Sequence, residues 1–129
     1  MAIDTLAVWH QIANDRNVAG LDGLLADHCV FHSSVVHTPQ VGKAVTTQYL
    51  TAALEVFFNE SFVYTRELTD DAHAMLEFQV EINGITVDCV DMLMWKHSDQ
   101  IIDFKVMIRP LKAIGALQEK MSKALDSLK

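Results

Sequence analysis

The chain has 129 residues, of which 50% are hydrophobic, and its formal net charge is −7. This length suits one domain, spanning residues 1–129, which can bury a core without a disulfide or a metal to hold it together. An acidic chain with no basic stripe is not expected to bind nucleic acid or an anionic membrane surface.

Two further features bear on the compartment of the protein. The apolar runs are too short to cross a bilayer, and the first residues have neither the positive charge nor the apolar stretch of a signal peptide. The two cysteines, Cys29 and Cys89, lie in apolar surroundings and do not resemble a secreted disulfide framework. We therefore expect a soluble, cytoplasmic protein in which both thiols are reduced and buried.

The first half of the chain is predicted to be mainly helical. Apolar residues at helical spacing predict a helix over residues 3–16, and residues 24–26 indicate a short second helix. Residues 29–33 read as a strand. A third helix is predicted over residues 43–58, directly after Gly42. Its expected inner face consists of Val45, Tyr49, Ala52, Ala53 and Val56.

The second half of the chain has the alternating pattern of antiparallel strands. Strands are predicted over residues 62–65, 76–82, 85–96 and 101–109. Asn83 and Gly84 form the best hairpin signal, because a type I′ turn needs positive φ at both central positions. An amphipathic helix is predicted after Pro110, which suits a first helical turn. Helices followed by a meander of strands point to an α+β fold.

Several segments carry a resemblance to a known family, and they cover nearly the whole chain: Asn14, Val18–Leu21, Leu24–Asp27, Val30–Ser33, Gly42, Val87–Asp91 and Gln100–Phe104. They resemble the nuclear-transport-factor-2-like superfamily, with its cystatin-like α+β fold, and most of all its SnoaL-like and ketosteroid-isomerase-like subgroup. The resemblance implies a curved antiparallel sheet with a mixed edge, shaped like a cone or half barrel around the N-terminal helices, with a C-terminal helix and an apolar, ligand-sized pocket. It does not define an activity, because this fold hosts enzymes, carriers and assembly modules.

The resemblance also suggests roles for three residues. In ketosteroid-isomerase-like members, a carboxylate on the first strand moves the proton, while a tyrosine on the first helix and a protonated aspartate on a later strand bind the oxyanion. The resemblance places Ser33, Trp9 and Asp91, respectively, at these positions. Serine cannot act as a general base near pH 7 without a partner that takes its proton. Steroid isomerisation by the family mechanism is therefore not expected, and the Asp/Arg/Asp arrangement of limonene-epoxide-hydrolase-like members is not found.

Asp91 is the most informative single position. The period of two along a strand places it on an apolar face, together with Val87, Cys89, Leu93 and Trp95. Desolvation on such a face raises the pKa of a carboxyl group and can keep it protonated, as a hydrogen-bond donor. The alternative is a buried aspartate whose carboxyl is satisfied by a backbone or tryptophan N–H.

Other candidate residues have ordinary explanations as well as functional ones. Trp9 offers an indole N–H donor, but a large aromatic residue on a helix stripe is usually part of the core. Ser33 could orient a ligand or a water molecule, or could simply be small enough for the strand end to turn. His37 lies on a loop that could fold over the pocket and replace the missing base, although a solvated loop histidine is the ordinary case.

The remaining histidines and cysteines do not predict a metal site or a nucleophile. His28 and His32 are four residues apart on a strand, about 13 Å, which is too far to share an ion. Cys29 and its histidine neighbours point to opposite faces. No metal and no cofactor is therefore expected.

The opposite face of the sheet is expected to carry an exposed apolar band, the outer band, made of Val90, Met92, Met94 and Met107. Such a band usually marks a partner surface. Family members commonly dimerise through this face, so the resemblance implies a homodimer with self-complementary contacts. The alternative is that the C-terminal helix covers the band.

Three functions remain open at this point. The first is binding of a small hydrophobic molecule in an apolar pocket, with Asp91 as the polar anchor. The second is an acid–base isomerase or cyclase-like lyase that acts on a hydrophobic carbonyl compound, with Asp91 and Trp9 as oxyanion donors. The proton would be moved by His37, by a water on Ser33 or by a group of the substrate. The third is a structural dimer with a filled interior. The expected pocket is lined by Trp9, Phe31, Ser33, Tyr49, Phe78, Asp91, Trp95 and Phe104.

Overall fold

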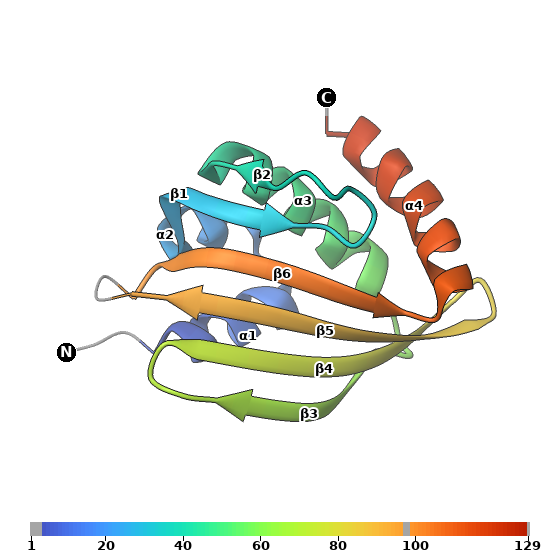
Figure 1. The fold of residues 1–129 in the computed structure, drawn as a ribbon, viewed down its shortest axis with the longest axis horizontal. Coiled ribbons are helices and arrows are strands. Elements are labelled where there is room, and N and C mark those ends of the chain that lie inside the picture. Colours follow the sequence, from blue (N-terminus) through green and yellow to red (C-terminus); the bar gives the residue numbers. More distant parts are fainter. Residues whose placement is uncertain (1–3, 97–98, 129) are drawn as a thin grey trace.

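A computed structural model describes residues 4–96 and 99–128. The helices and a short 3₁₀ turn within these ranges are α1 (Thr5–Asp15), the 3₁₀ turn (Val18–Gly20), α2 (Leu21–Leu24), α3 (Lys43–Phe57) and α4 (Leu111–Asp126). The strands are β1 (Leu25–His32), β2 (Gln40–Val41), β3 (Val63–Thr69), β4 (His73–Ile82), β5 (Ile85–Trp95) and β6 (Ile101–Arg109). Figure 1 shows these elements in sequence colours.

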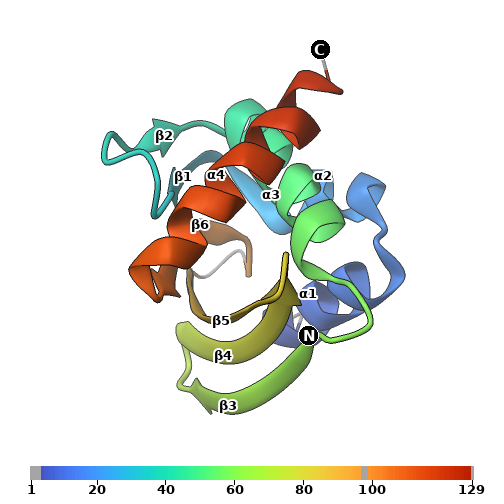
Figure 2. The same cartoon turned by 90° about the vertical axis from the view of Figure 1, so that its right-hand side faces the viewer.

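The strands form one mixed sheet in the order β2-β1-β6-β5-β4-β3. Strands β3 to β6 are consecutive antiparallel neighbours, whereas β1 pairs with β6 in parallel and β2 closes the edge. Figure 2 shows that the sheet curves around the helices. The α+β fold and its curved sheet with a mixed edge are therefore confirmed.

Local signals explain most of the element boundaries. The Asp4 side chain caps α1 by accepting a hydrogen bond from the Ala7 N–H at 3.0 Å, and Arg16 ends the helix in the left-handed region with φ of 52°. The β4–β5 hairpin turns at Asn83 and Gly84, whose φ values of 53° and 78° are those of the expected turn. The sequence also predicts a turn over residues 97–100, between β5 and β6, and residues 97–98 of it lie outside the described ranges.

The start of β1 differs from the sequence prediction. Residues 24–26 were expected to be helical, but the strand already begins at Leu25, which pairs with Ile101. The pairing then shifts register before Val30. This irregularity breaks the alternation of buried and exposed residues, so that the periodicity starts only at Cys29.

The inner face of α3 also differs from the prediction, because this helix has two apolar stripes. The buried side chains are Thr46, Leu50, Ala52, Leu54 and Phe57. The residues expected there, apart from Ala52, are only half-buried. Val45 and Tyr49 line a groove beside α4. The prediction chose the stripe that faces α4 rather than the one that faces the sheet.

The core consists of two adjoining clusters on the concave side of the sheet. The larger surrounds Trp9, Phe31 and Phe104, and the smaller packs Ala113 and Leu117 of α4 against strands β4 and β5. Helix α4 therefore covers one end of the concave face. Within the described ranges, no helix is long and apolar enough to cross a membrane. Both cysteines are free and buried, as predicted.

Candidate functional site

Asp91 lies in the middle of β5, between Leu76 of β4 and Val106 of β6. It is only 7% exposed, and the expected alternation holds along the strand, since Cys89 and Leu93 are buried on the same side. No residue in the described ranges donates a hydrogen bond to its carboxyl group. Burial alone raises the pKa of Asp91 to about 8. The group is therefore mostly neutral at pH 7 and can donate a hydrogen bond.

Trp9 comes from the opposite layer, on α1, and is 2% exposed. Its ring packs edge-on against Phe104, with 5.1 Å between the ring centroids. Its Nε1–H is buried and has no hydrogen-bond partner among the described residues. The suggestion that this indole satisfies Asp91 is thus wrong for the described structure, in which neither polar group pairs with the other.

Trp9 and Asp91 line the same apolar cavity. The volume that the centre of a water molecule can occupy in this cavity is about 20 Å³, which is enough for one water molecule. The ligand-sized pocket expected from the sequence is therefore present only as a narrow hollow. Its lining consists of Trp9, Leu50, Ala53, Leu54, Phe57, Phe58, Phe78, Asp91, Phe104 and Val106. Asp91 is the one carboxyl or imidazole group in this lining, so no general base stands opposite it.

Four of the eight expected pocket residues line this cavity: Trp9, Phe78, Asp91 and Phe104. Phe31 is buried close by, stacked against Tyr49 and Phe104 at centroid distances of 5.1 and 6.0 Å, but is not part of the lining. Tyr49 lines the groove beside α4 instead.

Ser33, Trp95 and His37 lie away from the cavity for identifiable reasons. Strand β1 ends at His32, so Ser33 is in a turn, where its hydroxyl accepts the Val35 N–H at 3.0 Å. The pairing of β5 with β6 shifts register between Met94 and Trp95, and the Trp95 indole donates to the Asp71 carbonyl at 2.9 Å. His37 is exposed on the loop.

The sequence reasoning missed one wall of the cavity, which is the end of α3. Leu50, Leu54, Phe57 and Phe58 all contribute to it. The signal was present in the adjacent aromatic residues Phe57 and Phe58, because a pair of such residues at a helix end must bury at least one ring.

A row of aromatic rings continues from this wall toward the surface. The ring of Phe58 stacks on that of Phe62, with 4.2 Å between the ring centroids. Phe62 packs edge-on against Tyr64 at a centroid distance of 4.9 Å, and Tyr64 packs edge-on against His10 at 5.0 Å. His10 also contacts the Glu67 carboxylate at 2.6 Å. Desolvation raises the pKa of the Tyr64 hydroxyl, and the negative charge of Asp91 raises it further. Tyr64 therefore stays neutral beside the cavity.

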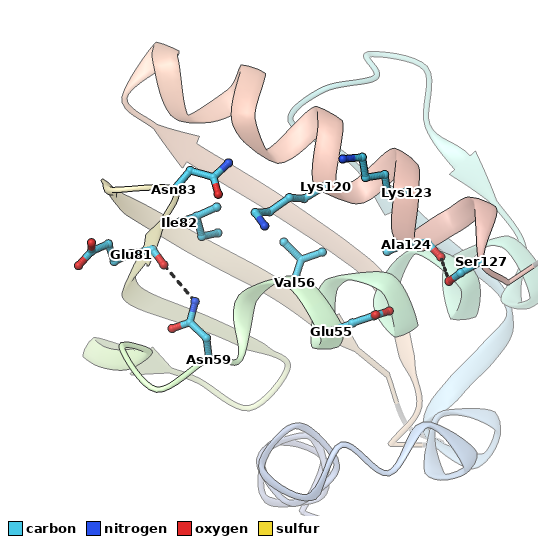
Figure 3. A pocket seen from close by; sticks show the side chains of 10 residues that line it. All are labelled: Glu55, Val56, Asn59, Glu81, Ile82, Asn83, Lys120, Lys123, Ala124 and Ser127. Carbon is cyan, nitrogen blue, oxygen red and sulfur yellow. Dashed lines mark hydrogen bonds between the residues drawn. The ribbon is translucent and has the colours of Figure 1, made fainter.

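A second hollow lies between α3, α4 and the β4–β5 turn (Figure 3). Its volume is about 470 Å³, larger than that of the Asp91 cavity, but it is an open groove. Lys120 and Lys123 stand along it on α4, with Glu55 on α3 and Glu81 on β4. Charges of both signs line it, so its composition selects no class of ligand.

The outer face of the sheet has its own polar pair. His32 Nε2 lies 2.8 Å from the Asp103 carboxylate, which joins β1 to β6. Across residues 4–96 and 99–128, no group of three or more His, Cys, Asp and Glu side chains is placed to hold a metal ion.

Comparison with solved structures decides the family. A steroid delta-isomerase from Pseudomonas aeruginosa is 36% identical to this chain and has a TM-score of 0.89, with 96% of this chain and 90% of that one covered. This chain belongs to the nuclear transport factor 2-like superfamily. The resemblance to this superfamily and to its ketosteroid-isomerase-like members, seen in the sequence, is thereby confirmed.

Two further solved structures are similar to this chain in fold. A protein with a cystatin-like fold from Silicibacter pomeroyi DSS-3 has a TM-score of 0.84 at 26% identity, covering 93% of this chain and 84% of that one. A protein assigned as a SnoaL-like polyketide cyclase from Jannaschia sp. CCS1 has a TM-score of 0.67 at 10% identity, covering 87% and 90% of the two chains, and supports the fold alone. No family model and no curated protein sequence matches the chain.

Proposed function

We propose that this protein binds a small hydrophobic molecule whose single carbonyl oxygen is held by Asp91 and Trp9. The observation that carries the proposal is that both side chains line one apolar cavity and neither has a hydrogen-bond partner among the described residues. A buried polar group without a partner costs about 1–3 kcal/mol. A ligand that supplies the partner recovers this free energy.

The two polar groups select an acceptor. The indole N–H can only donate, and a protonated carboxyl group also donates. One carbonyl oxygen can accept both hydrogen bonds with its two lone pairs, whereas an amine or ammonium group would face the indole N–H unfavourably. The rest of the lining is apolar, which suits a ligand whose remaining atoms form an aliphatic or aromatic group.

A second candidate is an acid–base isomerase, favoured by the 36% identity to a steroid delta-isomerase. The lining of the cavity argues against it, because its wall opposite Asp91 holds no group that could move a proton. Binding without turnover is thus the better supported function.

The test is isothermal titration calorimetry with a neutral aryl ketone, 2-acetylnaphthalene. We expect saturable binding to the natural chain and a loss of affinity in Asp91→Leu, which keeps the branched shape of the side chain but removes the donor. Equal affinity in both proteins, or no binding to either, would contradict the proposal. For the isomerase candidate, a steroid ketone with an isomerisable double bond is followed by its absorbance. Turnover that falls in Asp91→Asn would favour the enzyme.

We further propose a homodimer formed through the outer band. Support comes from the exposure of Met94 at 37% and Met107 at 56%, and from the position of α4, which packs against the concave cluster. Two free, buried cysteines are typical of a reducing compartment, so we also propose the cytoplasm as its location.

A further inference from the structure

The side chains that line the Asp91 cavity are not equally buried. Eight of its ten lining side chains are buried, and the two that are only partly buried are Ala53 and Phe58, both near the end of α3. The lining residues that reach solvent are therefore both at this end of the cavity. Ala53 has no side-chain torsion that could open a passage, whereas the ring of Phe58 can rotate about χ1 and χ2.

We propose that the Phe58 ring is the gate of this cavity and the residue that sets the size of the ligand admitted to Asp91 and Trp9. The inference rests on the proposed function and adds the element that decides which carbonyl compounds can enter. With the ring in place, about 20 Å³ is open, enough for one water. A larger molecule therefore needs the ring to move.

The backbone around Phe58 favours movement of the ring rather than of the whole connection. Phe58 follows the last residue of α3, with φ of −89° and ψ of 63°, and the Asn59 N–H donates to the Phe57 carbonyl at 3.0 Å. These values are close to an inverse γ-turn, a common conformation where an element ends. The turn fixes the direction of the Phe58 Cα–Cβ bond.

The residues after Phe58 are tied firmly to β4. Asn59 donates from Nδ2 to the Glu81 carbonyl at 3.0 Å, as drawn in Figure 3. Ser61 accepts the Glu81 N–H at 2.8 Å and donates its own N–H to the Asn59 side chain at 2.8 Å. These bonds anchor the connection on both sides of its turn, so opening by a swing of the loop would break several of them together.

The contacts of the Phe58 ring on its far side are of a different kind. Its stacked neighbour Phe62 is itself only partly buried, and Phe62 is held in turn by Phe78 at 4.8 Å. A ring that leaves this stack loses apolar contact but no hydrogen bond. Rotation of Phe58 therefore has a lower cost than disruption of the anchored turn, and Phe62 remains as a fixed surface for the ring to return to.

The test uses Trp9 as the reporter, in a Trp95→Phe background that removes the other tryptophan. Two measurements are made: collisional quenching of Trp9 by acrylamide, and stopped-flow association of acetophenone and of the larger 2-acetylnaphthalene. The variants are Phe58→Ala, which removes the gate, and Phe58→Tyr, which enlarges the ring without adding a second tryptophan. Val56→Ala is the matched control, because Val56 lies two residues earlier on α3 but lines the groove of Figure 3.

We expect Phe58→Ala to increase quenching and to raise the association rate constant by about tenfold, more for the larger ketone, since a required conformational change slows binding. Phe58→Tyr should lower both, and Val56→Ala should leave both unchanged. If Phe58→Ala does not fold, Phe58→Tyr still tests the gate in the opposite direction.

The outcomes separate the gate from the proposed function. Unchanged quenching and association in both Phe58 variants, with ketone binding that is still lost in Asp91→Leu, would overturn the gate alone. Quenching that follows the size of residue 58, without ketone binding in any variant, would support the gate and overturn the proposed ligand.

Discussion

The indole of Trp9 and the carboxyl group of Asp91 line one cavity from opposite layers of the fold, and each is without a hydrogen-bond partner among the described residues. Two unpaired buried polar groups in an otherwise apolar wall reduce stability. Apolar side chains at both positions would give a more stable core. The proposed ligand would supply the partner that both groups lack within the described ranges.

The pH dependence of stability should report the burial of Asp91. Burial raises the pKa of Asp91 from 3.8 to about 8. At a pH between these two values, the folded protein keeps a proton on Asp91 that the unfolded chain releases. The unfolded state binds fewer protons, and the free energy of unfolding therefore falls as pH rises, by about 1.4 kcal/mol per pH unit from this group. Below about pH 4 both states are protonated, and above about pH 8 both are ionised.

The measurement is denaturant unfolding between pH 4 and 9 for the natural chain and Asp91→Asn. The other titrating groups are common to both proteins, so their contributions cancel in the difference. Asp91→Asn should become progressively more stable than the natural chain as pH rises toward 8. A constant difference over this range would mean that the Asp91 carboxyl is not desolvated.

Replacing Trp9 by Phe should weaken ketone binding without abolishing it. The variant keeps an aromatic ring against Phe104 but removes the N–H donor, and one neutral hydrogen bond contributes about 0.5–1.5 kcal/mol, or roughly two- to tenfold in affinity. Calorimetry with 2-acetylnaphthalene checks this. Trp95→Phe is the control, since that indole is bonded to the Asp71 carbonyl away from the cavity. An equal effect of both substitutions would argue against a contact between Trp9 and the ligand.

Ser33 should matter for the turn and not for the ligand. Its hydroxyl accepts the Val35 N–H, so Ser33→Ala should lower the free energy of unfolding by about 1 kcal/mol. Ketone affinity, and any turnover of a steroid ketone, should stay unchanged. A selective loss of turnover with unchanged stability would return Ser33 to the reactive site that the family resemblance suggested.

Much of the fold follows from the sequence because its signals are local. The alternation along β5 places Asp91 correctly among buried neighbours, and Asn83 with Gly84 marks the hairpin. These features depend on strand period and turn chemistry, which one segment determines by itself. For the same reason β6 has the predicted limits.

The cavity wall is less predictable because it depends on how elements pack. Helix α3 carries one apolar stripe toward the sheet and another toward α4, and periodicity alone cannot tell which one meets Asp91. Ser33 and Trp95 were assigned to the pocket by extending an ideal strand, but β1 ends before Ser33, and the pairing of β5 with β6 shifts register before Trp95. Phe58 was missed because its direction is set by a turn that follows the helix.

The outer band provides the last prediction, which concerns the proposed homodimer. Met107 is 56% exposed and lies opposite Val90 in the sheet, so Met107→Lys should place a charge within the apolar contact and shift the protein toward monomers. Sedimentation velocity at several concentrations measures the shift. Leu111→Lys is the control, because Leu111 is 84% exposed at the start of α4, outside the band. A natural chain that sediments as a monomer at all concentrations, or equal dissociation by both substitutions, would contradict a dimer through this face.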